Sequence, residues 1–272
     1  MDTRQPEGTG VSMSVVHGID ALDSSLGRLF VVVGVFDGLH LGHEYLLRTL
    51  GDEAGRRGAR AAVITFDHHP DEVLTGSAPP LLCDPEERLE RLEAAGVAVT
   101  VVQTFDVALR ETPFDVFIRQ IADRVELAGF LMTPDSAFGY RRAGTPETVA
   151  ALGKEVGFEV AVALPFTLGG KTVSSSAIRA AIASGDLATA ERLLGRPYSV
   201  VGTPEQAGAT HQTPLAFAMP IALPPAGSYA VLIHAGSAEA PGHATVGATG
   251  TLSVHGATRQ SPRLRIVFAG AP

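Results

Sequence analysis

The side chains of this 272-residue chain that are best placed for chemistry on an anion are His40 and His43. They lie three residues apart, so on a helix the two imidazoles would share one face. Three glycines at positions 34, 38 and 42 surround them, and glycines let a ligand approach the backbone closely. A helix that begins here also offers unpaired backbone N–H groups and the positive end of its dipole. These features predict an anion site, and the anion we expect is phosphate.

The elements that must position the two histidines flank them in the sequence. Residues 29–33 form an apolar, valine-rich run that is typical of a buried strand in a parallel sheet. Apolar residues then recur at helical spacing, at Leu41, Tyr45, Leu46 and Leu50. The predicted unit is therefore a strand, a glycine-rich turn and a helix. The alternative is a metal site built on the histidine pair, but no third ligand at a suitable spacing is evident.

Composition narrows the class of protein. The formal net charge of −8 argues against a general nucleic-acid binder. Cys83 is the one cysteine, so no intrachain disulfide can form and a reducing compartment is favoured. The first ten residues lack an apolar signal core, and no apolar run approaches the roughly 20 residues that cross a bilayer. We expect a soluble cytoplasmic protein with no nucleic-acid or membrane partner, and the oligomeric state stays open.

Strand and helix patterns alternate along the chain. Strands are expected over residues 61–66, 97–105, 130–133 and 158–164 in addition to the first. Helices are expected over residues 84–96, 112–125, 175–184 and 187–194. Residues 1–13 are expected to be disordered, and residues 14–28 to form a loop and a short helix. This alternation predicts a Rossmann-like parallel sheet covered on both faces, with ligands bound beyond the carboxyl ends of its strands.

The ten residues GVFDGLHLGH at 34–43 resemble the nucleotidyltransferase signature G-x-F-D-G-x-H-x-G-H. This form of the signature belongs to the adenylyltransferase domain of bacterial riboflavin kinase/FAD synthetases. All seven specified positions match: Gly34, Phe36, Asp37, Gly38, His40, Gly42 and His43. The resemblance implies an ATP site formed by these residues apart from Gly42, in which His40 and His43 bind the phosphates as charge builds at the α-phosphorus.

A second candidate phosphate site is KTVSSSAIR at residues 171–179. Serines at the start of a helix cap it and can offer hydroxyls to a phosphate, and Arg179 one turn later could reach the same anion. The alternative is an ordinary helix cap with a solvated arginine. The segment resembles the S-S-T-x-I-R motif of the same family, with serine replacing threonine at position 176. That resemblance implies that Ser175, Ser176 and Arg179 bind ATP, with Arg179 catalytic at the leaving phosphates.

Two further segments resemble the flavin side of these enzymes. FDHHP at residues 66–70 is similar to F-D-P-H-P, and residues 133–139 are similar to G-x-D-F-x-F-G. The resemblance implies flavin contacts from four residues: Phe66, His69, Asp135 and Phe138. Thr133 and Ser136 replace the first glycine and the first phenylalanine, and the lost aromatic contact leaves the acceptor open. Taken alone, residues 66–70 could also be a turn with two solvent-exposed histidines.

Residues 200–272 differ from the rest of the chain. They contain five charged residues: Glu205, Glu239, Arg259, Arg263 and Arg265. GATHQTPLAF at 208–217 resembles the riboflavin kinase signature G-R-x-x-G-x-P-T-A-N, but Leu215 and Phe217 replace the threonine and asparagine that hold magnesium and phosphates. Apolar side chains cannot ligate a hard cation. The sequence also stops short of the kinase's C-terminal helix, so we expect a small, shortened β-barrel-like domain without kinase activity.

These features predict three parts: a disordered N-terminus over 1–13, an FMN adenylyltransferase-like domain over 14–199 and a degenerate riboflavin-kinase-like β domain over 200–272. The expected reaction converts ATP and FMN to FAD and pyrophosphate, with Mg²⁺ held mainly by substrate oxygens and no protein metal site. A chain ending near Val201 is expected to fold and to keep this activity. The alternatives are a related nucleotidyltransferase that acts on another phosphorylated acceptor, and a non-catalytic flavin- or nucleotide-binding protein.

Overall fold

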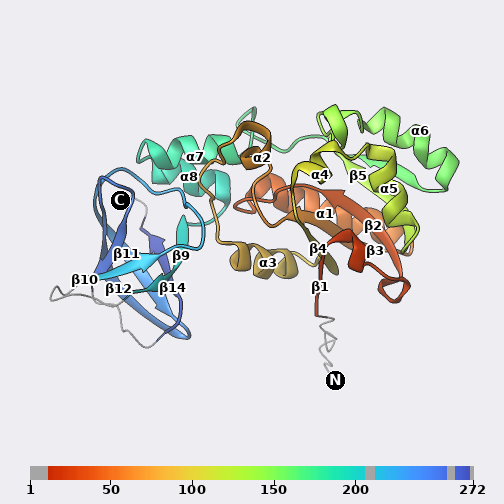
Figure 1. Ribbon diagram of the computed structural model, residues 1–272. Coiled ribbons are helices and arrows are strands. Elements are labelled where there is room, and N and C mark those ends of the chain that lie inside the picture. The colour runs from red at the N-terminus through yellow and green to blue at the C-terminus, as the bar shows by residue number, and fades with distance from the viewer. Residues whose placement is uncertain (1–11, 206–211, 256–260, 270–272) are drawn as a thin grey trace, which may run out of the picture.

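A six-stranded parallel sheet followed by a closed β-barrel makes up the computed structural model, which describes residues 12–205, 212–255 and 261–269 (Figure 1). The expected fold class is confirmed in both parts. None of the helices in these ranges is long and apolar enough to cross a membrane.

The sheet has the strand order β1-β4-β3-β2-β5-β6, and all of its pairings are parallel. Its strands are β1 (Ser14–His17), β2 (Arg28–Val33), β3 (Arg60–Phe66), β4 (Val99–Gln103), β5 (Glu126–Met132) and β6 (Glu159–Val162). From β2 the chain builds the sheet outward through β3 to β4, and then returns to the other side of β2 for β5 and β6. The topological switch point therefore lies between β2 and β5, where ligands of such sheets bind.

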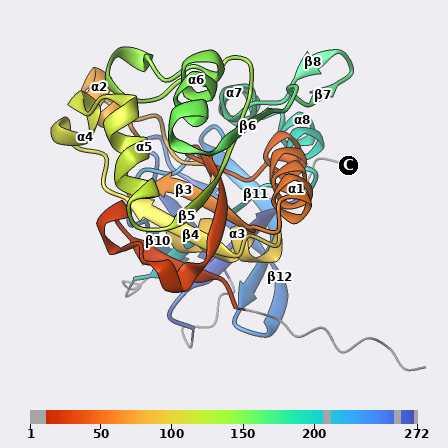
Figure 2. The same ribbon diagram turned by 90° about the vertical axis from the view of Figure 1, so that its right-hand side faces the viewer.

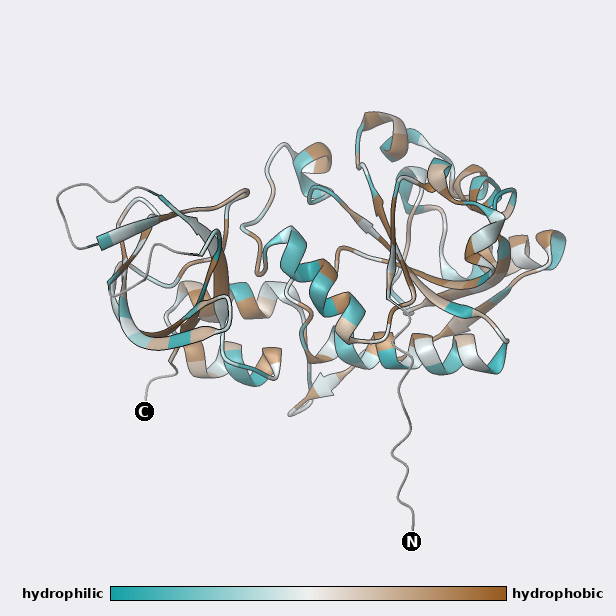
Figure 3. Ribbon diagram, turned by 90° about the horizontal axis from the view of Figure 1, so that it is seen from below, coloured by the Kyte–Doolittle hydropathy of each residue, from teal (hydrophilic) through white to brown (hydrophobic). Residues whose placement is uncertain are grey.

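Helices cover both faces of the sheet (Figure 2). On one face, Phe30 and Val32 of β2 belong to a buried cluster with residues of α1 (Leu41–Arg56) and α3 (Pro85–Ala94). Val31 points the opposite way and packs with α5 (Phe114–Ala122) and α6 (Pro146–Val156). Figure 3 shows apolar residues concentrated in the strands and alternating with hydrophilic residues along the helices. The valine-rich run thus lies at the centre of the sheet because both of its faces are covered.

Several helix starts lie where the sequence predicts them. The Asp84 carboxylate caps α3 by accepting hydrogen bonds from the Glu86 and Glu87 amides, and Pro85 occupies the first turn. Ser174 caps α7 (Ser175–Ala183), and Asp186 caps α8 (Leu187–Leu194). Side chains that accept backbone N–H groups are a local signal, so these boundaries can be found without tertiary structure.

The expectation for the N-terminal segment is wrong in part. Residues 1–11 lie outside the described residues, but Ser12 and Met13 are ordered, and the Met13 amide donates to the Glu93 carboxylate at 3.0 Å. Within the predicted loop, Ser14–His17 forms edge strand β1, followed by two 3-10 turns at Ile19–Ala21 and Ser24–Leu26. A four-residue strand is too short to show a clear alternating pattern, which is why the sequence did not reveal it.

Four short elements and one full-length helix, α6, were also missed. They are α2 (Asp71–Thr75), α4 (Val107–Glu111), the 3-10 turn η3 (Tyr140–Arg142), α6 and the small hairpin of β7 (Thr167–Leu168) with β8 (Lys171–Thr172). The helix α6 did carry local signals, because Thr145 caps it, Pro146 occupies its first turn and Gly157 ends it in a left-handed conformation.

The C-terminal segment forms a closed antiparallel barrel with the strand order β10-β13-β12-β11-β14-β9. Its strands are β9 (Ser199–Pro204), β10 (Gln212–Ala216), β11 (Gly227–Ala235), β12 (Ala238–Val246), β13 (Leu252–His255) and β14 (Leu264–Phe268). Leu215 is buried in the barrel core, and Phe217 packs against the same cluster. The first four residues of the kinase-like segment, 208–211, lie outside the described residues.

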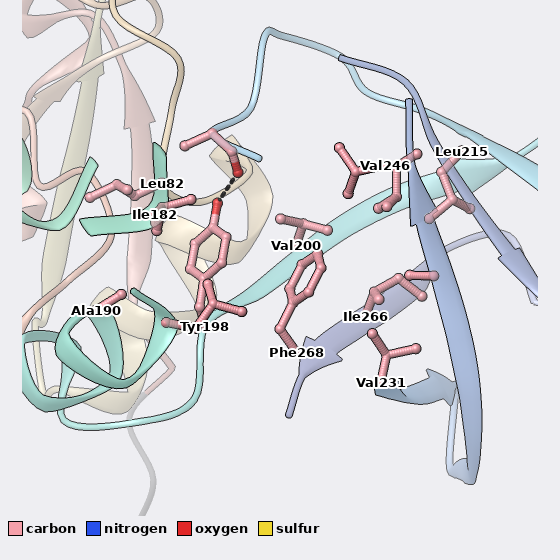
Figure 4. Close-up of a cluster of buried hydrophobic side chains, with 14 of the residues drawn as sticks. Leu82, Ile182, Ala190, Tyr198, Val200, Leu215, Val231, Val246, Ile266 and Phe268 are labelled. Carbon is pink, nitrogen blue, oxygen red and sulfur yellow. Dashed lines mark hydrogen bonds between the residues drawn. The ribbon is translucent and has the colours of Figure 1, made fainter. Parts of the chain in front are cut away.

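One buried apolar cluster spans the α/β unit and the barrel (Figure 4). Leu82 and Ile182 from the α/β unit pack in it with Tyr198, Val200 and Phe268. The Tyr198 ring stacks on Phe268 with centroids 5.9 Å apart, and its hydroxyl donates to a backbone carbonyl of the barrel segment, that of residue 222, at 2.5 Å. A chain ending near Val201 would lose the barrel side of this cluster.

Candidate active site

The two histidines lie at the start of α1, and their rings stack with centroids 3.8 Å apart. His40 is the N-cap residue, and its Nδ1 accepts a hydrogen bond from the His43 amide at 3.2 Å. In the neutral ring the proton therefore lies on Nε2, which can donate to a ligand. A Cβ at Gly42 would lie 3.1 Å from the His40 ring and 3.2 Å from the Val173 carbonyl oxygen, so this close packing favours glycine. The predicted helix start is confirmed, but His40 precedes the helix with an extended backbone, so ring stacking and the cap bond, not a shared helix face, bring the two imidazoles together.

Both histidines are uncharged at neutral pH. Burial, with the nearby Arg196 and Arg179 charges, lowers the pKa of His40 to about 4. Burial, followed by the neighbouring His40, lowers the pKa of His43 well below its usual value. The Nδ1 atom of His43 is buried and has no hydrogen-bond partner among the described residues. A buried polar atom without a partner costs free energy, so packing alone does not explain a histidine at this position.

Phe36 and Gly34 shape the turn between β2 and α1. Phe36 is buried, adopts a left-handed backbone conformation with φ of 53°, and its ring centroid lies 5.1 Å from that of His43. A Cβ at Gly34 would lie 3.0 Å from the Phe36 ring, so a larger residue would crowd it. Direct contacts of Gly34, Phe36 and Gly38 with ATP stay predictions.

Asp37 joins three elements that are distant in sequence. Its buried carboxylate accepts hydrogen bonds from the Leu82 and Cys83 amides at 2.8 and 3.3 Å. The other carboxylate oxygen forms an ion pair with Arg179 at 2.7 Å. Its backbone carbonyl accepts from the Ser175 hydroxyl at 3.0 Å. The structure thus gives Asp37 a positioning role that the sequence did not reveal, and its contact with ATP stays a prediction.

The two predicted phosphate motifs lie together, because these contacts bring the start of α7 beside the start of α1. Arg179 also donates from Nε to the Pro80 carbonyl at 2.9 Å, so protein groups hold its guanidinium in place. Ser176 lies exposed in the first turn of α7. Two helix N-termini therefore meet near a fixed arginine, which favours a polyanion. ATP binding by Ser175, Ser176 and Arg179 stays a prediction.

Two arginines that the sequence did not single out as functional hold the carbonyl groups of the same turn. Arg88 donates to the Val35 carbonyl at 3.2 Å and to the Phe66 carbonyl at 2.7 Å. Arg196 donates to the carbonyls of Gly38 and Leu39. Burial lowers the pKa of Arg196 to about 10, so it stays charged at neutral pH. Arg196 lies in LLGRPY, which resembles the segment between the family's two domains, whereas Arg88 has no local signal.

A pocket of about 570 Å³ lies beyond the carboxyl ends of β2, β3 and β5, at the switch point. All four predicted flavin residues line it: Phe66, His69, Asp135 and Phe138. Gly34 of the first motif lines it too, so the pocket adjoins the glycine-rich turn. Further lining residues include Leu74, Phe105, Leu109, Phe117, Arg110 and Arg142. Apolar and aromatic walls with a few polar groups suit a planar aromatic ligand, and flavin contacts stay a prediction.

Thr133 and Ser136, the two residues of the 133–139 segment that differ from the family pattern, are hydrogen-bonded to each other. The Ser136 hydroxyl accepts from the Thr133 amide at 2.9 Å and lies 2.8 Å from the Thr133 hydroxyl. Arg141 and Arg142 have left-handed backbone conformations with φ of 54° and 57°, and Arg142 donates to the Asp135 carbonyl at 3.2 Å. The pocket therefore keeps an ordered wall although the aromatic residue is absent.

Comparison with known proteins finds a sequence family model and curated relatives that match this chain. Residues 23–177 match the family model described as FAD synthetase. The bifunctional riboflavin kinase/FMN adenylyltransferase of Haemophilus influenzae is 35% identical over 192 residues, covering 70% of this chain and 62% of the relative. The enzyme of the same name from Escherichia coli K12 is 33% identical over 193 residues, with coverages of 70% and 62%. The chain thus matches less than two thirds of the length of these relatives.

A solved structure resembles the whole fold. The crystal structure titled macrolide-efflux protein from Streptococcus pneumoniae superposes with a TM-score of 0.79 at 21% identity, covering 96% of this chain and 91% of that one. At this identity the likeness concerns the fold alone, and it includes the barrel.

Proposed function

The chain belongs to the FAD synthetase family, and from this premise we propose that it makes FAD and pyrophosphate from ATP and FMN. A phosphate oxygen of FMN attacks the α-phosphorus of ATP, and the bond from that phosphorus to the bridging oxygen of pyrophosphate breaks. One observation carries the proposal. The pocket that gathers all four predicted flavin residues adjoins, through Gly34, the turn that leads to His40 and His43.

The protein residues act by positioning and by stabilising charge, because the acceptor phosphate is itself the nucleophile. His40 donates from Nε2 to a phosphate oxygen, and His43 adds a second donor from the same helix start. Arg179 and the hydroxyls of Ser175 and Ser176 bind the phosphates that leave as pyrophosphate. Neutral imidazoles suit this role, since they donate hydrogen bonds without repelling the nearby arginines.

Mg²⁺ enters this proposal as part of the substrate MgATP. In the described ranges, no group of three or more histidine, cysteine, aspartate or glutamate side chains could hold a metal ion. The nearby Asp37 carboxylate is already bonded to Arg179 and to two amides. Phosphate oxygens of ATP are therefore the ligands that we assign to the ion, consistent with the preference of Mg²⁺ for substrate phosphates.

A cytoplasmic location and the absence of nucleic-acid or membrane partners are also part of the proposal. The cysteine count supports the location, since Cys83 is the one cysteine of the sequence and sequences without disulfides are usual in a reducing compartment. The net charge of −8 supports small-molecule substrates over nucleic acid.

The test is product analysis with a panel of acceptors. The protein is incubated with ATP, Mg²⁺ and FMN, riboflavin or other phosphorylated acceptors, and the products are separated by chromatography. FAD and pyrophosphate are expected from FMN. A folded protein that yields an adenylylated product only from another acceptor would show a related nucleotidyltransferase, and binding without any product would show a non-catalytic protein.

A further inference from the structure

The segment from Pro80 to Glu90, here called the connector, lies between the barrel and the turn that joins β2 to α1, and it is hydrogen-bonded to both. We propose that the connector makes the barrel a positioning part of the nucleotide site, so that barrel residues far from the substrates set the affinity for ATP. The assignment of that ligand depends on the proposed function.

The side of the connector that faces the site is hydrogen-bonded to the signature residues. The Leu82 and Cys83 amides bind the Asp37 carboxylate, and the Pro80 carbonyl accepts from Arg179. The Cys83 sulfur accepts from the Gly38 amide at 3.3 Å. Arg88, in the helical part of the connector, binds the Val35 carbonyl, as described above. The turn that carries His40 is therefore built against this segment.

The other side of the connector is hydrogen-bonded to the barrel. The Leu81 amide donates to the Pro220 carbonyl at 2.8 Å, and the Ala222 amide donates to the Leu81 carbonyl at 2.8 Å. These two bonds form an isolated parallel bridge between Leu81 and Ile221. The Leu82 side chain lies in the apolar cluster shared with the barrel. Leu81 is thus fixed by the barrel, while its neighbour Leu82 binds Asp37.

Ion pairs join the same two parts. Arg263, which precedes β14, pairs with Asp84 and Glu86. Arg265, within β14, pairs with Glu87 and Glu90. Residues 200–272 contain only five charged residues, and two of them make these contacts with the connector. The nearly uncharged barrel therefore places both arginines against α3, the helix that carries Arg88. Figure 1 shows α3 between the barrel and the sheet.

Continuity of the chain turns these contacts into a mechanical link. Leu81, Leu82 and Cys83 are consecutive, so a shift of Leu81 on the barrel displaces the two amides that hold Asp37, and with it Arg179. A misplacement of about 1 Å can cost roughly 100-fold in activity, even when it arises far from the chemistry. Among the contacts of the described residues, the connector is hydrogen-bonded to the flavin pocket through Arg88 alone, which binds the carbonyls of Val35 and Phe66, so the remaining walls of the pocket should stay in place.

The experiment uses the full chain and removes both barrel cations in the double variant Arg263→Ala/Arg265→Ala. The double lysine variant keeps the charges. Arg124→Ala is the matched control, since it removes a 2.7 Å ion pair with Asp20 that involves no residue of the connector. MgATP affinity is measured by calorimetry without FMN, FMN affinity by fluorescence quenching, and melting temperature by circular dichroism.

In the double alanine variant we expect the Kd for MgATP to rise about tenfold or more, a fraction of the effect that misplacement can have. The Kd for FMN should stay within about twofold. The lysine variant should recover most of the MgATP affinity, because it keeps the charges, and Arg124→Ala should behave as the wild type.

Several outcomes would overturn the proposal. An unchanged MgATP affinity in a folded double variant would do so, as would a parallel loss of MgATP affinity, FMN affinity and melting temperature, which indicates general destabilisation. A wild type that binds no MgATP would also contradict it. If the wild type binds MgATP but forms no FAD, the proposed function fails while the MgATP comparison still decides the role of the connector. If the double variant does not fold, Arg263→Ala alone is measured in the same way.

Discussion

At the scale of single residues, the site depends on histidines that are kept neutral. Stacking of His40 on His43 would be unfavourable if both rings were charged, and burial already disfavours the charged form of each. Neutral rings leave the positive charge of the site to Arg179 and Arg196. In the proposed reaction the arginines would therefore supply charge, and the histidines would supply directed hydrogen-bond donors.

Replacing His43 with alanine should lower kcat/KM for FAD formation by about 100-fold or more, since loss of one donor to developing phosphate charge costs about 3 kcal/mol. The melting temperature should change little. Steady-state kinetics and thermal unfolding of the variant test this, with His243→Ala on the exposed surface of β12 as the control. Normal turnover would show that His43 is structural.

The depressed pKa of His40 predicts a loss of stability in acid. An unfolded histidine titrates near 6.5 and the folded His40 near 4, so between these values the unfolded chain binds a proton that the folded chain does not. The contribution is complete above about pH 6.5 and is lost as the pH falls towards 4. At pH 5 the loss is roughly 2 kcal/mol relative to pH 7.

Urea unfolding of the wild type and of His40→Asn at pH 7 and pH 5 measures this contribution. Asparagine keeps a capping acceptor and does not titrate, so the variant should lose less stability on acidification than the wild type. The His243→Asn variant should match the wild type. Equal acid sensitivity of His40→Asn and the wild type would contradict the assignment.

At the scale of secondary-structure elements, the site is a junction of the β2–α1 turn, the connector and the start of α7. Each contributes groups that its own local structure leaves free: backbone amides, a carboxylate and a guanidinium. The carboxylate of Asp37 binds the two amides of the connector and the guanidinium of α7 at once, and therefore its loss should affect all three elements together.

Asp37→Ala should destabilise the protein by about 3 kcal/mol or more, because it leaves a largely buried arginine and two amides without their partner. Denaturant unfolding measures the change. The matched control is Asp20→Ala, whose side chain is 85% exposed in its ion pair with Arg124, and it should change stability little. Similar effects of the two substitutions would show that the buried carboxylate does not hold the junction.

Gly38→Ala should be more damaging than Gly58→Ala. Both glycines have left-handed conformations, with φ of 80° and 60°, and that conformation costs an alanine about 1 kcal/mol. A Cβ at Gly38 would also lie 2.8 Å from the Leu82 Cβ, whereas a Cβ at Gly58 would meet nothing within 4 Å. Urea unfolding compares stability and FAD formation compares activity. Equal losses of stability and activity in the two variants would mean that Leu82 of the connector can move away from the new Cβ without a free-energy cost.

At the scale of the whole molecule, the barrel is part of the architecture of the site. It completes an apolar cluster with α7 and α8, and it carries the arginines that meet α3.

We expect no FMN from riboflavin and ATP under conditions in which FAD is made from FMN. Leu215 is 7% exposed in the barrel core and Phe217 packs beside it, so neither offers an oxygen to a magnesium ion or replaces the polar residues of the kinase signature. Chromatography of a reaction started from riboflavin tests this. Time-dependent appearance of FMN would contradict this prediction and show that the protein has riboflavin kinase activity.

The sequence by itself determined the local parts of the protein. The strand before Gly34, the helix start at His40 and the capped starts of α3, α7 and α8 all follow from patterns within a few residues. Capping and alternation depend on neighbours in the chain, so they can be read directly. Resemblance to short motifs also predicted four residues that contact the flavin; all four line one pocket, and the flavin contacts stay a prediction.

Only the tertiary structure decided how these parts support each other. The Asp37–Arg179 pair joins residues 142 positions apart, and Arg196 reaches the Gly38 carbonyl across 158 positions. The barrel was expected to be separable, yet it shares a buried cluster and a bridge at Leu81 with the α/β unit. Such contacts have no local pattern, because a buried polar group is satisfied by whichever segment the fold brings to it.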